Sequence, residues 1–199
     1  MNDIPQQLRD IKQSLRGMMN GVVSASMRQK GLTYKVNFGV ELPRLQAFAT
    51  ELPHTRPLAQ ALWQEDIREC RLLAAMLQPA DDFPPELAEE WVASMRFTEE
   101  VECCVMYLFQ YLPYASGKAF EWMASPRAVS QECGFQLIAR LISRGARPVG
   151  RDADEFLDQA VAAFQGPEGR VAAAARRALL KYVALGPDEE NAVRQALQG

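Results

Sequence analysis

The sequence has few of the residues on which common catalytic motifs depend. Its single histidine, His54, follows Pro53 in a connecting segment without an evident nucleophile partner, so a catalytic triad is not expected. The patterns GxSxG, HExxH, GxGxxG and the P-loop do not occur, which excludes the common hydrolase, zinc-protease and nucleotide-binding signatures. We therefore expect no cofactor and no bound metal.

Cysteine is also scarce, with four residues in 199, and their spacing fits neither a zinc site nor a CxxC motif. All four stand in apolar segments of helical periodicity: Cys70, Cys103, Cys104 and Cys133. Free cysteine usually packs as a small buried side chain, and reduced thiols are usual in the cytoplasm. We expect four buried, reduced thiols in a cytoplasmic protein.

No apolar run approaches the roughly 20 residues that a membrane-spanning helix needs. The most apolar window, Val101–Leu112, contains Glu102 and Gln110 and is followed by Pro113. The N-terminal residues mix acidic and basic side chains and lack the apolar block of an export signal. These features favour a soluble protein that does not enter a membrane, and we expect a monomer.

Positive charge is not in excess, because 22 Lys and Arg stand against 25 Asp and Glu, for a net charge of −3. DNA binding depends on cations gathered on one face, so only their distribution favours it here. Three groups are candidates for phosphate contacts: Arg140, Arg144, Arg147 and Arg151; Arg170, Arg176, Arg177 and Lys181; Arg68 and Arg71. The alternative for each arginine is a solvated helix face on which it pairs with Asp or Glu.

Apolar residues recur at steps of three and four along nearly the whole chain, which predicts an all-α protein. Proline and glycine mark the helix starts and stops. The predicted helices cover a stripe from Ile4 to Leu15, then 22–30, 42–51, 57–65, 66–77, 84–95, 99–112, 116–123, 127–143, 152–164, 168–184 and 188–198. Tyr34–Val40 has β-like content but is predicted to be a connection, and Thr98 is predicted to cap the helix that follows it.

Taken in pairs, these helices recur at roughly 35–40 residues, a period typical of helical-repeat solenoids. Two architectures fit, a curved stack of antiparallel helix pairs and a globular bundle, and the short connections favour the stack. We expect one such domain over residues 1–199. The tryptophans Trp63, Trp91 and Trp122 occupy apolar periodic positions and are expected to pack in the core.

Six blocks, in this order and spacing, resemble the HEAT-like repeat DNA glycosylases that excise alkylated purines. They are NFGVELPRLQAFATEL (37–52), LAQALWQEDIRECRLLAAML (58–77), EEWVASM (89–95), CCVMYLF (103–109), YASGKAFEWMAS (114–125) and ECGFQLIARLI (132–142). Each block is a weak motif alone. The resemblance implies an α-α superhelix, a C-shaped stack of helix pairs whose basic concave face binds duplex DNA, alkylated or not.

The resemblance also implies a site of one aspartate, two tryptophans and one arginine. In such a site a carboxylate near C1′ stabilises the oxocarbenium-like centre while the cationic base departs, and indole faces hold the sugar and base. Alignment places Glu102 at the aspartate, with Arg140, Arg144, Arg147, Arg177 and Lys181 as DNA-binding candidates. Without the resemblance, Glu102 reads as one of several acidic residues at the start of a helix.

The other site positions depart from the family pattern. One tryptophan is replaced by Thr98 with Phe97 beside it, the arginine by Glu132, and the second tryptophan falls near Arg177. Because an extra methylene in Glu102 displaces the carboxylate, and because a misplacement near 1 Å costs about a hundredfold in rate, glycosylase activity is expected to be weak or lost. The alternative is a non-catalytic helical-repeat module that binds a protein.

Overall fold

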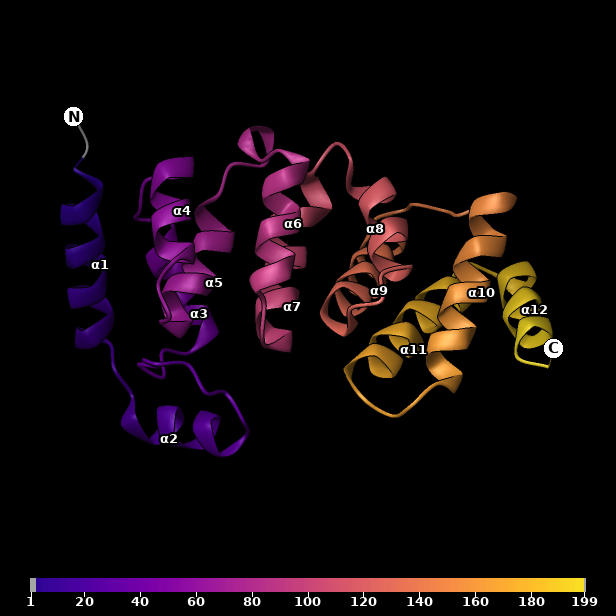
Figure 1. Ribbon diagram of the computed structural model, residues 1–199, viewed down its shortest axis with the longest axis horizontal. Helices are drawn as coiled ribbons and strands as arrows, with labels where there is room; N and C mark the ends of the chain where they lie inside the picture. The colour runs from indigo at the N-terminus through magenta and orange to yellow at the C-terminus, as the bar shows by residue number, and fades with distance from the viewer. Residues whose placement is uncertain (1–2, 199) are drawn as a thin grey trace. The chain divides into compact units, whose positions relative to one another are not determined.

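The computed structural model describes residues 3–198, whose helices are labelled in Figure 1. The contacts of the chain divide after Phe83 into two compact units. The first unit holds α1 (Ile4–Gly17), α2 (Gly21–Gln29), α3 (Leu42–Ala49), α4 (Arg56–Trp63), α5 (Arg68–Leu77) and the 3₁₀ turn η1 (Ala80–Asp82). The second holds α6 (Pro85–Ser94), α7 (Thr98–Tyr107), the 3₁₀ turn η2 (Phe109–Tyr111), α8 (Ala115–Met123), α9 (Ala128–Ser143), α10 (Arg151–Gln165), α11 (Arg170–Val183) and α12 (Pro187–Ala196). The all-α prediction is confirmed.

Proline opens many of these helices, as the sequence pattern predicted. A proline stands within the first two positions of α1, α3, α4, α6 and α12, where its missing N–H costs no helical hydrogen bond. Within residues 3–198, no helix is long and apolar enough to cross a membrane.

In the first unit, α4 and α5 pack against each other, with α1 against α4 and α3 against α5. The core is made of fully buried aliphatic side chains such as Leu15, Leu62 and Leu73, and Trp63 joins it as predicted. The segment 30–41 connects α2 to α3 without forming a strand, also as predicted. It is tied to the start of α5 by a single parallel β-bridge between Val36 and Ile67.

A buried carboxylate holds the same connection in place. Glu69, with no exposed surface, accepts hydrogen bonds from the backbone N–H groups of Phe38 and Val40, both at 3.1 Å. The guanidinium of Arg68 donates to Glu69 at 3.2 Å and to the carbonyl of Val40 at 3.0 Å. Burying these charges is tolerated because each is paired and hydrogen-bonded.

In the second unit α9 is central and packs against α6, α7, α8 and α11. Gly134 allows the approach of α8, since a Cβ at this position would lie 2.7 Å from the carbonyl oxygen of Ala119. Trp91 and Trp122 are both buried, and the indole of Trp122 stacks obliquely on Phe109 with ring centroids 5.3 Å apart. The prediction that the tryptophans serve packing is confirmed.

Two local predictions around α7 were wrong. Phe97, and not Thr98, occupies the N-cap position, where its side chain makes no capping hydrogen bond. The buried carboxylate of Glu100 accepts hydrogen bonds from the backbone N–H groups of Arg96 and Phe97. The helix predicted to reach 112 ends at Tyr107, because the backbone turns at Leu108 into the 3₁₀ turn η2.

Candidate functional site

A polar stripe runs along α9 in the second unit. Its residues stand four apart, which places them on one helix face: Glu132, Gln136, Arg140 and Arg144. The stripe is buried at Glu132 and Gln136, half-buried at Arg140 and exposed at Arg144. Its helix packs against α7, η2 and α11, and the stripe is bonded by Gln110 of η2 and by Arg170 of α11.

Glu102, the predicted catalytic carboxylate, is paired with Arg177. The Oε1 atom of Glu102 on α7 accepts from the guanidinium of Arg177 on α11 at 3.3 Å, and both side chains are about half exposed, 49% and 53%. An exposed pair of this kind contributes about 0–1 kcal/mol to folding. Its larger effect is electrostatic, because the guanidinium offsets the negative charge of the carboxylate.

Arg140 and Arg144 are both held by Gln110. The Nε of Arg140 donates to the side-chain Oε1 of Gln110 at 2.8 Å, and Arg144 donates to the Gln110 backbone carbonyl at 2.6 Å. The guanidinium of Arg144 also lies over the ring of Tyr111, 4.7 Å from its centroid. These partners are neutral oxygens and an aromatic ring, so the two positive charges are positioned without being neutralised.

Glu132, which stands where the family resemblance implies an arginine, is buried. Its side chain is 1% exposed and forms an ion pair with Arg170 at the start of α11, while Gln136 donates to it at 3.2 Å. Arg170 also donates to the backbone carbonyl of Arg96 at 3.1 Å. Repulsion between Glu132 and a DNA backbone is therefore not expected, because Arg170 compensates the buried carboxylate.

Two further DNA-binding candidates differ in their availability. Arg147 forms an ion pair with Glu189 at 2.7 Å, and its hydrogen bond lowers the pKa of the Glu189 carboxyl and raises the pKa of Arg147 itself. This arginine is thus largely neutralised within the unit. Lys181 stands one helical turn after Arg177 and is exposed, as is Arg176.

The aromatic side chains that could replace the missing indoles, Phe97, Phe135 and Tyr182, offer little stacking surface. Phe97 is half-buried, and the guanidinium of Arg96 lies over its ring at 5.1 Å. Phe135 and Tyr182 are 1% and 4% exposed, so neither presents a ring face to a ligand. Thr98 has no ring. The indole faces that the resemblance implies have no counterpart at these positions.

Most of the predicted site residues lie on elements that pack together in the second unit, because α9 packs against α7, η2 and α11. We call this group the arginine surface: Glu102, Gln110, Arg140, Arg144, Arg177 and Lys181. Arg177 bonds to Glu102, and Met106, one turn after Glu102, contacts the side chain of Gln110, which in turn holds Arg140 and Arg144. Lys181 extends this surface along α11. Arg147, tied to α12 through Glu189, is not joined to it by any contact among residues 3–198.

The third predicted group of phosphate-binding candidates, Arg68 and Arg71, lies in the first unit, and both side chains are engaged within it. Arg68 is buried and pairs with Glu69, while Arg71 lies over the indole of Trp63 at 4.5 Å. Sequence reasoning also missed Gln110 and Tyr111, which position the two arginines of α9. The sequence does indicate Gln110, because a glutamine is unusual inside an otherwise apolar window. It was interpreted only as evidence against a membrane span.

Comparison with known proteins identifies the family and the fold of the chain. The family model described as DNA alkylation repair enzyme matches residues 11–197. One solved structure is similar to this chain, with a TM-score of 0.82 and 14% sequence identity. The match covers 95% of this chain and 82% of the chain in that structure. That structure is described as a new family of proteins related to the HEAT-like repeat DNA glycosylases with affinity for branched DNA structures. No curated protein sequence matches the chain. The predicted helical-repeat fold, preferred over a globular bundle, is confirmed.

Proposed function

Because the chain belongs to the DNA alkylation repair enzyme family, we propose that it binds DNA through the arginine surface and that base excision through Glu102 is weak or lost. Two observations carry this proposal: Glu102 is paired with Arg177, and the partners of Arg140 and Arg144 in the second unit carry no negative charge.

The arrangement of Arg140 and Arg144 suits phosphate binding. Each guanidinium is fixed by a hydrogen bond to Gln110, and it retains N–H groups that those bonds do not use. A fixed guanidinium loses less side-chain freedom when it binds phosphate oxygens, and its charge releases counterions from the DNA. Lys181 and Arg176, exposed on α11, add to the positive charge of the same unit.

The ion pair argues against efficient glycosylase chemistry. A carboxylate that stabilises an oxocarbenium-like sugar does so with uncompensated negative charge, which Arg177 offsets here. Alkylated purines carry positive charge, so a guanidinium near the position where the family resemblance implies an indole repels the base. We infer that the protein recognises DNA structure without cleaving the glycosidic bond.

The structural relative suggests which DNA is bound. That protein family has affinity for branched DNA, and we propose the same class of ligand for this chain. A branched ligand fits a site without the indole faces that the family resemblance implies for a single damaged base, because phosphate contacts need no base to be held.

Binding is tested by fluorescence anisotropy with a four-way junction and a linear duplex of equal length, over a range of salt concentrations. We expect the junction to bind more tightly. For the double substitution Arg140→Gln and Arg144→Gln we expect roughly tenfold weaker binding and a salt slope reduced by about two. The control Arg194→Gln removes an arginine that pairs with Glu190 on α12 and should bind as the parent does.

A salt-independent response of the parent, or no binding, would contradict the proposal and favour the alternative of a protein-binding module. Catalysis is tested separately by the release of 7-methylguanine and 3-methyladenine from methylated DNA. We expect no release above background from the parent or from Glu102→Gln. Release by the parent that Glu102→Gln abolishes would show that Glu102 is an active catalytic group.

A further inference from the structure

The first unit contains the longest stretch of the chain without an acidic residue. Residues 11–40 include five Lys and Arg and no Asp or Glu. Shorter acid-free stretches, 133–151 and 169–187, contain the arginines of α9 and α11. The N-terminal stretch therefore has the charge pattern of the arginine surface but belongs to the other unit.

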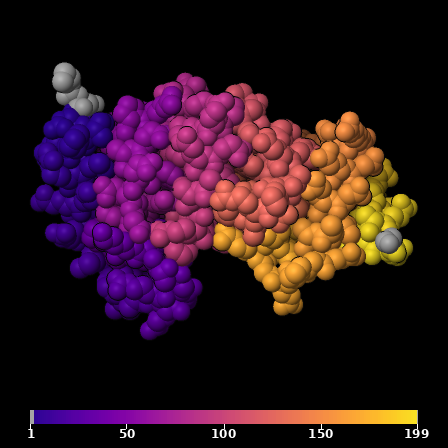
Figure 2. Space-filling view, viewed as in Figure 1, coloured from indigo at the N-terminus to yellow at the C-terminus, as the bar shows by residue number. Residues whose placement is uncertain are grey.

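Four of these five cations are available to a ligand. Arg16 ends α1, Arg28 lies in α2, and Lys30 and Lys35 lie in the connection that follows; all four are exposed, and no carboxylate pairs with them among residues 3–198. Lys12 differs, since it donates to Glu65 at 2.9 Å. We call residues 16–35 the basic lobe, and Figure 2 shows this indigo-to-purple segment protruding from the first unit.

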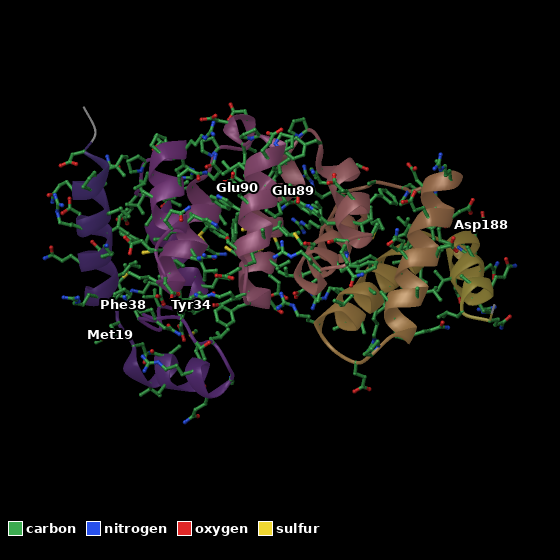
Figure 3. All side chains as sticks on the ribbon, in the orientation of Figure 1. Met19, Tyr34, Phe38, Glu89, Glu90 and Asp188 are labelled. Carbon is green, nitrogen blue, oxygen red and sulfur yellow. The ribbon has the colours of Figure 1, made fainter. Side chains whose placement is uncertain are left out.

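The basic lobe also exposes two large apolar side chains. Met19 is 59% and Val22 83% exposed, and they stand on either side of the first residue of α2. Figure 3 places Met19 next to Phe38, whose carbonyl accepts a hydrogen bond from the backbone N–H of Asn20 at 2.8 Å. Apolar side chains that stand among cations are used by nucleic-acid-binding proteins to lie against bases that have lost a stacking neighbour.

Within the basic lobe, α2 is held in place by residues 37–39 of the connection that follows it. Ser24, buried in α2, donates to the carbonyl of Asn37 at 2.7 Å. Gly39, at φ +72°, lies so close to α2 that a Cβ would approach the backbone nitrogen of Ser24 to 2.6 Å. The buried Glu69 fixes the connection on its other side. The exposed side chains are thus presented by an ordered support.

We propose that the basic lobe is a second nucleic-acid-binding surface, in which Arg16, Arg28, Lys30 and Lys35 contact phosphates while Met19 and Val22 lie against bases exposed where a duplex opens. This inference rests on the proposed function. It assigns the preference for branched over linear DNA to the first unit, and general phosphate affinity to both units.

An anionic membrane is a poorer partner for the same surface. An interfacial helix needs a broad apolar stripe opposite its charged face. The helix α2 has nine residues, and one of its faces is occupied by the contact of Ser24 with the connection. Two exposed apolar side chains do not make such a stripe, whereas they suffice to cover an unstacked base.

The first test neutralises the cations of the lobe. In the variant with Arg16, Arg28, Lys30 and Lys35 all changed to Gln, we expect weaker junction binding and a salt slope reduced by about three to four. The control Arg44→Gln, an exposed cation of α3, should bind as the parent does. An unchanged salt slope in the fourfold variant would overturn the proposal.

The second test removes the apolar side chains with Met19→Ser and Val22→Ser. We expect the preference for the junction over the duplex to fall by about tenfold while the salt slope stays unchanged, because no cation is lost. Both side chains are exposed, so the thermal midpoint should match that of the parent. A retained junction preference would refute the role of these residues.

Parallel measurements distinguish a lobe that binds DNA from one that binds membranes. They also separate a failure of the lobe proposal from a failure of the proposed DNA binding. Sedimentation with phosphatidylserine vesicles should show no binding, and vesicle binding that the fourfold variant abolishes would assign the lobe to membranes instead. If the parent binds no DNA, the proposed function itself fails. If the parent binds DNA and only the Arg140 and Arg144 substitutions weaken it, the arginine surface stands and the lobe proposal fails.

Discussion

Gly134 lies where α9 packs tightly against α8, and the absence of a side chain there allows this close packing. A Cβ there would meet the carbonyl of Ala119 at 2.7 Å and the side chain of Met123 at 2.9 Å. Backbone atoms cannot move aside as a flexible side chain does, so the two helices must separate to admit a methyl group.

We expect Gly134→Ala to lower the free energy of unfolding by about 1–3 kcal/mol, measured by urea denaturation. The matched control is Gly117→Ala in α8, where a Cβ meets nothing within 4 Å. There the added methyl group should stabilise the helix by about 0.5–1 kcal/mol. Equal effects of the two substitutions would show that α8 and α9 are not in close contact at Gly134.

The four cysteines are free and buried, which confirms the prediction for these residues. Burial, with smaller effects from Glu65 and Glu69, raises the pKa of Cys70 to about 12, and burial also raises the pKa of Cys133 well above its usual value. Because the thiolate is the reactive form, both thiols should be inert at pH 8.

Labelling with an aromatic disulfide reagent at pH 8, followed by mass spectrometry, should therefore leave Cys70 and Cys133 unmodified in the folded protein. In urea both should react completely. Rapid modification of either thiol without denaturant would mean that its surroundings open on the timescale of the reaction.

The partners of individual arginines were the part of the site that the sequence predicted least well. Spacing predicted Arg140 and Arg144 on one helix face, and the structure has them there. The same reasoning grouped Arg68 with Arg71, although Arg68 is buried against Glu69. A helical period places a side chain on a face, but burial depends on what packs over that face, here a connection 28 residues away in sequence.

At the scale of elements, the helices were largely predictable because their ends are marked by proline, glycine and changes of period. The end of α7 was not, since Leu108 and Phe109 continue the apolar pattern of the helix. Both side chains are fully buried although the backbone has left the α-helical conformation at Leu108. Tertiary packing in this segment overrides the helical pattern, and the resulting turn carries the Gln110 that holds two arginines.

The helix α12 is attached to the connection between α9 and α10 by the pair of Arg147 and Glu189. A hydrogen bond from Arg147 lowers the pKa of Glu189 below its ordinary value of 4.5. A carboxyl whose folded pKa is depressed stabilises the fold above its ordinary pKa, and this contribution is lost as the pH falls through the folded value.

Hydrogen exchange of the α12 amides, corrected for intrinsic rates, should show protection decreasing as the pH falls from about 5 to 3. In Glu189→Gln the protection should be lower at neutral pH and should change less over this range. Glu190→Gln, which alters an exposed pair on the same helix, serves as the control. The same pH response in the parent and Glu189→Gln would exclude this pair as its cause.

At the scale of the whole chain, the net charge of −3 gave little indication of a DNA-related family. The order of six weak sequence blocks was more informative than composition, because the fold is retained at 14% identity to the solved structure. The net charge conceals how the charges are distributed along the chain. Many cations lie in the three acid-free stretches, whereas the acidic residues lie in the other segments. Counterion release depends on that local density and not on the sum over the chain.

The residues that hold the basic lobe in place differ from those that it exposes to solvent. Its backbone is secured by Ser24, Gly39 and the carboxylate of Glu69, none of which is among the exposed side chains of the lobe. Replacement of the outward residues therefore leaves folding intact. Relatives that keep this support are free to acquire new ligand preferences by drift, and the same positions are suitable for a randomised library in protein engineering.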